Sequence, residues 1–367
     1  MSKKDKPIRV KLIVNPGAGV ASDSTDNLKL VTGYLKKNGL KADVARAKPK
    51  TRATPLAKQA VKDGYKIVIA MGGDGTVEAV MRGMIGSKAR LGIIPVGIEN
   101  NIAKNLGIPE NMKEACALVA SDDTRKLDVG RVKTGKGKWF SFFEAVCIGN
   151  STAVLPDGNK AIGGEASAVQ TVDLPSVQQE IQPKVFLNLD DERIIKAETM
   201  LVMVTNTPVF GKKFLVAPGG PLKDGILDIS VFQGFSKDDL GGYYASKMNG
   251  GYSGSGKVRR YQAGKLKVKS SLRLKVTADG IELGKGMVTI KMRLAALRVI
   301  AATKSPDLVK LPKSEAVPVP ARDEVVPVPA QDEGIAVPAA QTVENPPKPV
   351  SASVKKPNPR KKVIPLQ

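Results

Sequence analysis

Short apolar runs alternate with amphipathic stretches over the first 126 residues of the chain. Runs rich in Val, Ile and Leu predict buried strands, and apolar residues at every third or fourth position between them predict helices with one buried face. Strands are expected at residues 8–16, 41–47, 66–73 and 90–97, and helices at 24–38, 54–64, 76–84, 99–107 and 111–121. This alternation favours a parallel sheet with helices on its faces.

The helix expected at residues 54–64 carries its own boundary signals. Thr54 is predicted to cap its N-terminus, Pro55 to occupy the first helical position, and Gly64 to follow its end. A hydroxyl side chain, a fixed φ and freedom to adopt positive φ suit these three positions in turn.

From residue 127 the pattern changes to short strand-like runs separated by Gly, Asp and Asn turns. It predicts a second, mostly antiparallel β domain over 127–304, with its clearest helix at 236–248. Residues 305–367 lose this periodicity, fill with Pro, Ala and Val, and contain a nine-residue repeat at 316–324 and 325–333. We expect a disordered tail there, whose basic end is either inert or a tether to a membrane or partner.

Composition limits the chemistry that the chain can perform. Among its 367 residues there is no histidine, which excludes Ser-His-Asp and Cys-His nucleophiles and histidine-ligated metals. Acid–base work is left to Asp, Glu, Lys or Tyr. Cys116 and Cys147 fit buried thiols in a reducing compartment better than a disulfide scaffold. Because the chain lacks both an apolar run of ~18 residues and a secretory signal, we expect a cytoplasmic protein without a membrane-spanning helix.

The formal net charge of +23 predicts an anionic partner. Nucleic acid is disfavoured, because basic residues interleaved with stacking aromatics are lacking. An anionic membrane surface and a phosphate-rich substrate both fit the charge. Residues 265–275 (KLKVKSSLRLK) alternate basic and apolar positions, which predicts a strand whose basic face is either solvated or in contact with a membrane.

The stretch 72–76, Gly-Gly-Asp-Gly-Thr, joins an expected buried strand to an expected helix that begins at Thr76. Glycines allow close backbone approach, and a helix N-terminus offers N–H groups and a positive dipole end to an anion such as phosphate. The carboxylate of Asp74 would repel phosphate unless it holds a bridging Mg²⁺ or accepts a proton from a hydroxyl. The alternative is an ordinary strand–helix turn capped by Asp74, and the motif by itself does not decide between the two.

Four stretches, in this order along the chain, resemble the diacylglycerol kinase catalytic-domain family, which includes soluble bacterial lipid kinases and the sphingosine and ceramide kinases. They are VNPGAG at 14–19, MGGDGTVEAVMRGM at 71–84, LGIIPVGIENNIAKNLGIP at 91–109 and ADGIELG at 278–284. LDVGRV at 127–132 and APGGPLKDGILDISVF at 217–232 are similar to the family as well. Together, in this order and spacing, the motifs are specific, although each alone is weak.

The resemblance implies an ATP- and Mg²⁺-dependent lipid kinase of two lobes. A Rossmann-like nucleotide-binding domain is expected over 1–126 and a β-sandwich lipid-binding domain over 127–304. The γ-phosphate would pass to a lipid hydroxyl, diacylglycerol by default, on an anionic membrane to which the protein associates peripherally. The resemblance leaves open whether the protein forms a homodimer. The resemblance implies nucleotide contacts from Asn15, Gly72, Gly73, Gly75, Thr76, Gly97 and Asn100, metal contacts from Asp74 and Asp128, and catalytic roles for Asp74 and Glu282.

The chain departs from the family pattern in the third motif. Ile98 stands where the family has a threonine that helps hold the nucleotide, and Glu99 adds negative charge near the triphosphate. Asn101 replaces an aspartate of the metal network. Lys104 stands where arginine is common, which keeps the charge but loses the bidentate fork.

The last motif is offset by one residue. The family's acid usually follows Asp-Gly directly, whereas here Ile281 intervenes before Glu282. Because successive strand residues point to opposite faces, Glu282 either reaches the cleft or is merely a neighbour of the acid's position. Two main alternatives follow: a working kinase, and a degenerate homologue that binds nucleotide or lipid in a regulatory or structural role. A relative of NAD kinase or phosphofructokinase would share the GGDG-type turn but fits the other motifs less well.

Overall fold

The computed structural model describes residues 6–16, 24–48, 52–121, 123–149, 182–207, 209–210, 214–215, 224–234 and 257–302. All of them belong to one compact unit, Met1–Val328. The helix predicted at 236–248 and the tail predicted at 305–367 lie outside the described residues, and both stay predictions.

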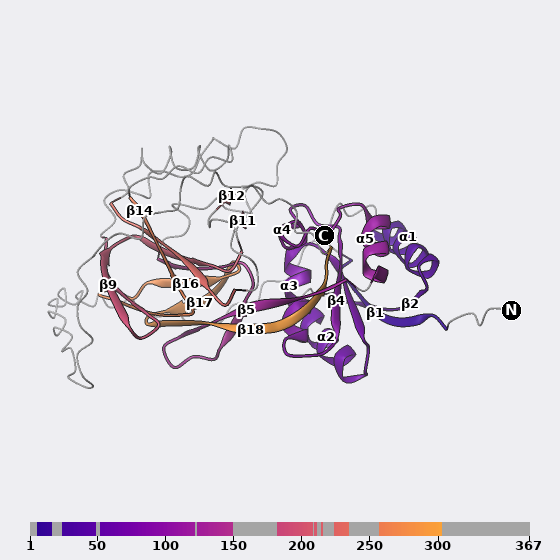
Figure 1. Cartoon of the computed structure of the whole chain (residues 1–367), viewed down its shortest axis with the longest axis horizontal. Coiled ribbons are helices and arrows are strands. Elements are labelled where there is room, and N and C mark those ends of the chain that lie inside the picture. Colours follow the sequence, from indigo (N-terminus) through magenta and orange to yellow (C-terminus); the bar gives the residue numbers. More distant parts are fainter. Residues whose placement is uncertain are drawn as a thin grey trace, which may run out of the picture. The chain divides into compact units, whose positions relative to one another are not determined.

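The N-terminal lobe is the parallel α/β structure that the alternating pattern predicts. Its strands β1 (Ile8–Val14), β2 (Leu40–Arg46), β3 (Ile67–Gly72) and β4 (Arg90–Pro95) pair in parallel in the order β2-β1-β3-β4. The helices are α1 (Ser24–Lys37), α2 (Ala53–Lys62), α3 (Asp74–Met84), α4 (Asn101–Asn105) and α5 (Met112–Ser121). Helix α1 packs against α5, and α2 against α3, with the two pairs on opposite sides of the strands (Figure 1).

The second lobe is a sandwich of two mostly antiparallel layers. Its strands are β5 (Thr124–Thr134), β6 (Phe140–Phe142), β7 (Ala145–Gly149), β8 (Lys184–Leu189), β9 (Arg193–Glu198), β10 (Leu201–Thr205), β13 (Leu227–Phe232), β14 (Val258–Ala263), β15 (Lys265–Ser270), β16 (Lys275–Ala278), β17 (Ile281–Lys285) and β18 (Val288–Ile300), with a separate short pair, β11 (Val209–Phe210) and β12 (Phe214–Leu215).

One layer of the sandwich is a six-stranded sheet in the order β14-β13-β10-β7-β16-β17. The other layer continues the sheet of the N-terminal lobe through β18, β15, β8 and β9, with β5 paired to β18 and β6 paired to β5. Buried aliphatic side chains from both layers, such as Leu266 and Val202, form a single second core. The predicted β-sandwich is therefore confirmed.

Strand β18 joins the two lobes into one sheet. It pairs antiparallel with β5 over most of its length. Near its end it also pairs in parallel with β4, with Arg298 opposite Arg90 and Val299 opposite Leu91. Figure 1 shows β18 beside β5 as it runs toward β4. The domain boundary predicted at residue 126 falls inside β5, and residues near 300 complete the sheet of the N-terminal lobe.

Helices α2 and α3 begin earlier than the sequence predicts, whereas α4 begins at Asn101, two residues after the expected start at residue 99. Helix α2 begins at Ala53 after Arg52, so Thr54 is not its cap and Pro55 is not its first residue; the Thr54 hydroxyl instead donates a hydrogen bond to the Ala79 carbonyl of α3 (2.7 Å). Helix α3 begins at Asp74, two residues before the expected start at Thr76. The expected end of α2 is confirmed, because Gly64 follows it with φ +81°. Among the described residues, no helix combines the length and apolar character needed to cross a bilayer.

The close contact of α2 with α3 depends on Gly83. A Cβ added there would lie 2.6 Å from the Ala57 Cβ and 2.6 Å from the Thr54 carbonyl oxygen, whereas one added at the exposed Gly33 of α1 would meet nothing within 4 Å. We expect Gly83→Ala to destabilise the protein by about 1–3 kcal/mol through overpacking. Gly33→Ala is expected to stabilise it by up to about 1 kcal/mol through helix propensity. Urea unfolding of both variants measures the two signs, and equal effects would contradict the packing argument.

Candidate active site

The candidate site lies where β1, β3 and β4 end. In the order β2-β1-β3-β4 the direction of chain crossover reverses between β1 and β3. Ligands of open α/β sheets bind outside the carboxyl ends of the strands at such a switch point. Asn15 follows β1, residues 72–76 run from the last residue of β3 into α3, and residues 97–101 follow β4. The topology therefore gathers most of the sequence-predicted site residues at one edge.

Asn15 and Thr76 join the first two of these segments. The Asn15 side-chain amide donates to the Thr76 hydroxyl oxygen (3.2 Å), and the Asn15 backbone N–H donates to the Met71 carbonyl (3.2 Å). Thr76 is buried, and a Cβ at Gly72 would lie 2.6 Å from the Thr76 Cβ. Gly72 is therefore required by the Thr76 side chain, which fixes the turn from β3 into α3.

Gly73 and Gly97 bring the second and third segments into backbone contact. A Cβ built on Gly97 would lie 2.4 Å from the Gly73 Cα. Asn100, with φ +53°, closes the second loop: its side chain accepts from the Gly97 N–H and donates to the Gly97 carbonyl, both at 2.9 Å. These glycines are explained by loop-to-loop packing, while Gly75 in the first turn of α3 is exposed.

Asp74 is held by the neighbouring helix α4 rather than by its own helix. Gly73 precedes α3 without a side-chain cap, and the Asp74 Oδ1 accepts the backbone N–H of Ile102 in α4 (3.0 Å). The side chain is half-buried. The cap reading of Asp74 is wrong, since the carboxylate links the start of α3 to the start of α4.

The departures of the third motif line the same edge. Ile98 is 71% exposed, and Asn101 donates from its side-chain amide to the Glu99 carboxylate (3.2 Å). The Lys104 ammonium pairs with Glu110 at the surface (3.2 Å). The bond from Asn101 thus holds the Glu99 carboxylate, which carries the added negative charge, in place.

Asp128 and Glu282 are not brought into contact with Asp74. The buried Asp128 carboxylate accepts the backbone N–H groups of Gly225 (2.9 Å) and Ala295 (2.6 Å), so both of its oxygens hold chain segments together. Glu282 is exposed on β17 and pairs with Lys275 at 2.9 Å. In the part of the chain that the structure describes, no group of three or more acidic or Cys side chains is placed to hold a metal ion.

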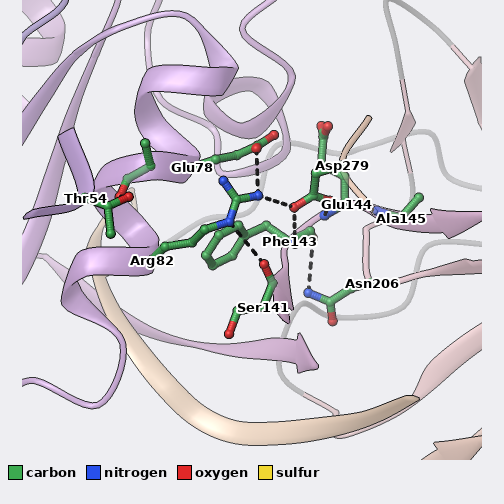
Figure 2. A network of polar contacts seen from close by, with 10 residues as sticks. Thr54, Glu78, Arg82, Ser141, Phe143, Glu144, Ala145, Asn206 and Asp279 are labelled. Carbon is green, nitrogen blue, oxygen red and sulfur yellow. Dashed lines mark hydrogen bonds and ion pairs between the residues drawn. The ribbon is translucent and has the colours of Figure 1, made fainter. Parts of the chain in front are cut away.

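A buried polar network beside the site was missed by the sequence analysis. The Arg82 guanidinium of α3 bonds to the carboxylates of Glu78 and Asp279, both at 3.0 Å, and to the Ser141 carbonyl (3.2 Å). Figure 2 shows Arg82 between these two acids. The ring of Phe140 lies 4.7 Å from the guanidinium carbon.

Asp279 is the centre of this network. Its side chain is fully buried and accepts the backbone N–H groups of Phe143 (3.0 Å), Glu144 (3.0 Å) and Ala145 (3.2 Å) as well as the bond from Arg82. It lies in the two-residue turn from β16 to β17, where Asp279 and Gly280 have φ +44° and +71°, as a type I′ hairpin requires. The Asp-Gly pair of ADGIELG at 278–284 is the sequence signal for this turn.

Acidic groups outnumber the one cation of the network. Burial, followed by the nearby charge of Asp279, raises the pKa of Glu78 to about 8 despite the attraction of Arg82. Burial together with the charges of Asp279 and Glu78 raises the pKa of Glu144 well above its ordinary value. Burial also raises the pKa of Asp279, against the opposing effect of Arg82. The lobes therefore meet at a group of carboxyls that bind protons more readily than exposed ones.

The family model for the diacylglycerol kinase catalytic domain matches residues 9–132, and the model for the YegS C-terminal NAD kinase beta sandwich-like domain matches residues 173–301. Residues 9–132 are therefore a diacylglycerol kinase catalytic domain, followed by the sandwich domain found beside it in YegS. The catalytic domain is that of a lipid kinase.

Three named relatives are similar to the chain over half of its length or more. A diacylglycerol kinase of Bacillus subtilis is 26% identical over 74% of this chain and 89% of the relative, and a probable YegS-like lipid kinase of Pseudomonas aeruginosa is 28% identical over 72% and 85%. A diacylglycerol kinase of Mycobacterium tuberculosis is 31% identical, but the chain spans 62% of its length. The crystal structure of a putative diacylglycerol kinase from Bacillus anthracis superposes with a TM-score of 0.67 at 24% identity, covering 83% of this chain and all of that one, which shows the shared fold.

The buried polar network around Asp279 predicts that the stability of the protein depends on pH. Because folding raises the pKa of Glu78, the folded protein keeps a proton that the unfolded chain releases above about pH 4.5, and this stabilisation is lost as the pH rises to about 8. We expect Glu78→Gln to show a shallower decline in unfolding free energy across that window, by a few kcal/mol. Urea unfolding at several pH values measures it.

Glu192→Gln is the matched control, because Glu192 is exposed in a turn. It should keep the wild-type pH profile. A Glu78→Gln profile that runs parallel to the wild type would show that Glu78 does not titrate in this window.

Proposed function

We propose that this lipid kinase transfers the γ-phosphate of ATP to the hydroxyl of a membrane lipid, with diacylglycerol as the first acceptor to test. The observation that carries the proposal is the meeting of Asn15, residues 72–76 and residues 97–101 at the β1/β3 switch point. Helix α3 begins there, and the N–H groups of its first turn suit an anion such as a nucleotide phosphate. The names of the relatives support the acceptor class.

Asp74 is the acid to which we assign the central role. It is half-buried at the start of α3, and the Ile102 N–H fixes one of its oxygens. Such a carboxylate suits Mg²⁺, which proteins usually bind through one or two carboxylates together with substrate phosphates and water. When bound, the ion would neutralise charge on the transferring phosphoryl group. Asp74 also lies at the edge of the sheet where we propose that an acceptor hydroxyl approaches the phosphate.

A small pocket of about 20 Å³ lies beside the residue that anchors Asp74. Met81 of α3, Ile102 and Leu106 at α4, Leu127 of β5 and Phe143 contribute to its lining. Ile102, which anchors Asp74, therefore also lines this pocket, which has room for about one water rather than for a lipid chain. Glu282 is exposed and paired with Lys275, so we do not assign it the proton transfer.

The departures from the family pattern in the third and last motifs support a second candidate function. Ile98 offers no hydroxyl, Asn101 offers an amide in place of a carboxylate, and the acid-bearing strand position after Asp279-Gly280 is Ile281. A homologue that binds nucleotide or lipid without catalysis would tolerate these changes. The two functions differ in one measurement, the transfer of phosphate to lipid.

We expect Asp74→Asn to lower phosphate transfer at least about 100-fold, because loss of a positioned acid–base or metal-holding carboxylate typically costs this much. Glu282→Gln, the matched control, is expected to keep transfer within about twofold because its carboxylate is exposed to solvent. Radioactive γ-phosphate of ATP, traced into a panel of lipid alcohols with and without Mg²⁺, measures both variants.

The controls separate the alternatives. Circular dichroism and unfolding of both variants check that the fold persists. If Glu282→Gln loses transfer and Asp74→Asn keeps it, the roles assigned above are wrong. If the wild-type chain transfers phosphate to no lipid of the panel, the non-catalytic homologue is the better description.

A further inference from the structure

One face of the sandwich layer formed by β5, β18 and β15 is strongly basic. Along these strands Val132, Ile290 and Leu266 point into the core, so the residues on either side of each point away from it. The outward residues that carry a positive charge are Arg131, Lys133, Lys291, Lys265 and Lys267. We call these five residues together with Trp139 the basic face.

The register places like charges directly opposite one another. Arg131 pairs with Lys291, which pairs with Lys265, so three cations form one row across the strands. In the next row Lys133 and Lys267 flank Thr289. Like charges opposite each other destabilise a sheet, so this arrangement has a cost in the free protein that an external anionic surface would relieve.

Acidic neighbours neutralise the basic face at one margin. Asp191, in the turn between β8 and β9, pairs with both Lys265 and Lys267. Within the described residues, no carboxylate pairs with Arg131, Lys133 or Lys291. The uncompensated charge therefore lies on the part of the face formed by β5 and β18.

Trp139 occupies the centre of that uncompensated part. Its ring lies 5.0 Å from the Arg131 guanidinium carbon, 5.3 Å from the Lys133 ammonium and 4.9 Å from the Lys291 ammonium. The side chain is half-buried, and Lys136 and Lys138 in the adjoining loop are exposed. An amphipathic indole ring among cations suits the headgroup level of a bilayer, where Trp is enriched.

We propose that the basic face, centred on Trp139, is the surface by which this protein docks on anionic phospholipid membranes. The inference rests on the proposed function, since a kinase acting on a lipid has to reach a bilayer. It adds the place of contact: the outer face of β5 and β18, with Arg131, Lys133 and Lys291 on lipid phosphates and Trp139 among the headgroups. Each such cation near an anionic surface contributes about 1 kcal/mol.

The basic face is joined to the candidate site through β6. Ser141 pairs with Arg131 across the strands, and its carbonyl accepts a bond from Arg82. Arg82 belongs to α3, the helix that begins with Asp74. A membrane bound at this face would therefore contact the strands that support α3.

The chain itself supplies a reporter for this surface. Trp139 is its one tryptophan, so intrinsic tryptophan emission comes from the centre of the basic face. We expect vesicles of equimolar phosphatidylglycerol and phosphatidylcholine to bind the full chain, shift this emission to shorter wavelength and protect it from a water-soluble quencher. Vesicles of phosphatidylcholine alone should do neither, and added salt should reverse the effect because it screens the charges.

Variants test which residues carry the binding. Lys133→Gln with Lys291→Gln removes two charges from the face and should weaken co-sedimentation with the anionic vesicles roughly 30-fold, at about fivefold per charge. The matched control is Lys36→Gln with Lys37→Gln, which removes two exposed charges from the last turn of α1 and should bind like the wild type. Thermal unfolding of both double variants checks that the fold is retained.

Three outcomes would overturn the proposal. They are vesicle binding without a change in Trp139 emission, equal binding losses in the two double variants, and no binding to anionic vesicles. A shift of the emission by duplex DNA but not by vesicles would assign the face to nucleic acid instead. Phosphate transfer to a short-chain diacylglycerol in neutral detergent micelles is measured separately. If that transfer fails while the vesicle results hold, the proposed function fails and the docking face stands.

Discussion

One buried carboxylate, Asp279, connects helix α3 to the chain between β6 and β7 across the boundary of the two lobes. It accepts three consecutive backbone N–H groups from residues 143–145 and the guanidinium of Arg82 from α3. A buried charge with so many donors is stabilised where an isolated one would be expelled, and the loss of a partner leaves the remaining charge uncompensated. Since α3 begins at the candidate site, the same bonds that join the lobes also restrain the helix whose first residue is Asp74.

The fold was accessible from the sequence because its main features are local. Apolar runs such as residues 67–72 are fully buried as β3, and Gly64 ends α2 with the positive φ that its position predicts. The errors are also local and have physical reasons. Thr54 has the side chain of a helix cap, but its hydroxyl bonds to the Ala79 carbonyl of a neighbouring helix, a partner that sequence spacing does not reveal.

The part of the candidate site that lies at the ends of neighbouring strands was predictable. The contacts between residues far apart in the sequence were not. The ends of β1, β3 and β4 must lie together in a parallel sheet, so Asn15, Asp74 and Gly97 could be grouped in advance. The partners of Asp128 come from Gly225 and Ala295, residues about a hundred and more positions later, so the sequence did not show that this carboxylate connects distant segments. Asp279 was overlooked for a similar reason, because its three donors belong to a loop more than 130 residues earlier.

Strand β18 has a consequence for how the chain folds during synthesis. The N-terminal lobe pairs its strand β4 with residues 298 and 299, so a ribosome must make nearly three hundred residues before this sheet is complete. Until then β4 presents an unpaired edge, which is a template for pairing with other chains. Contacts of such long sequence separation also form slowly, because loop closure has to precede them. During synthesis β4 therefore lacks this neighbour until residues 298 and 299 have been made, and β18 then covers its edge.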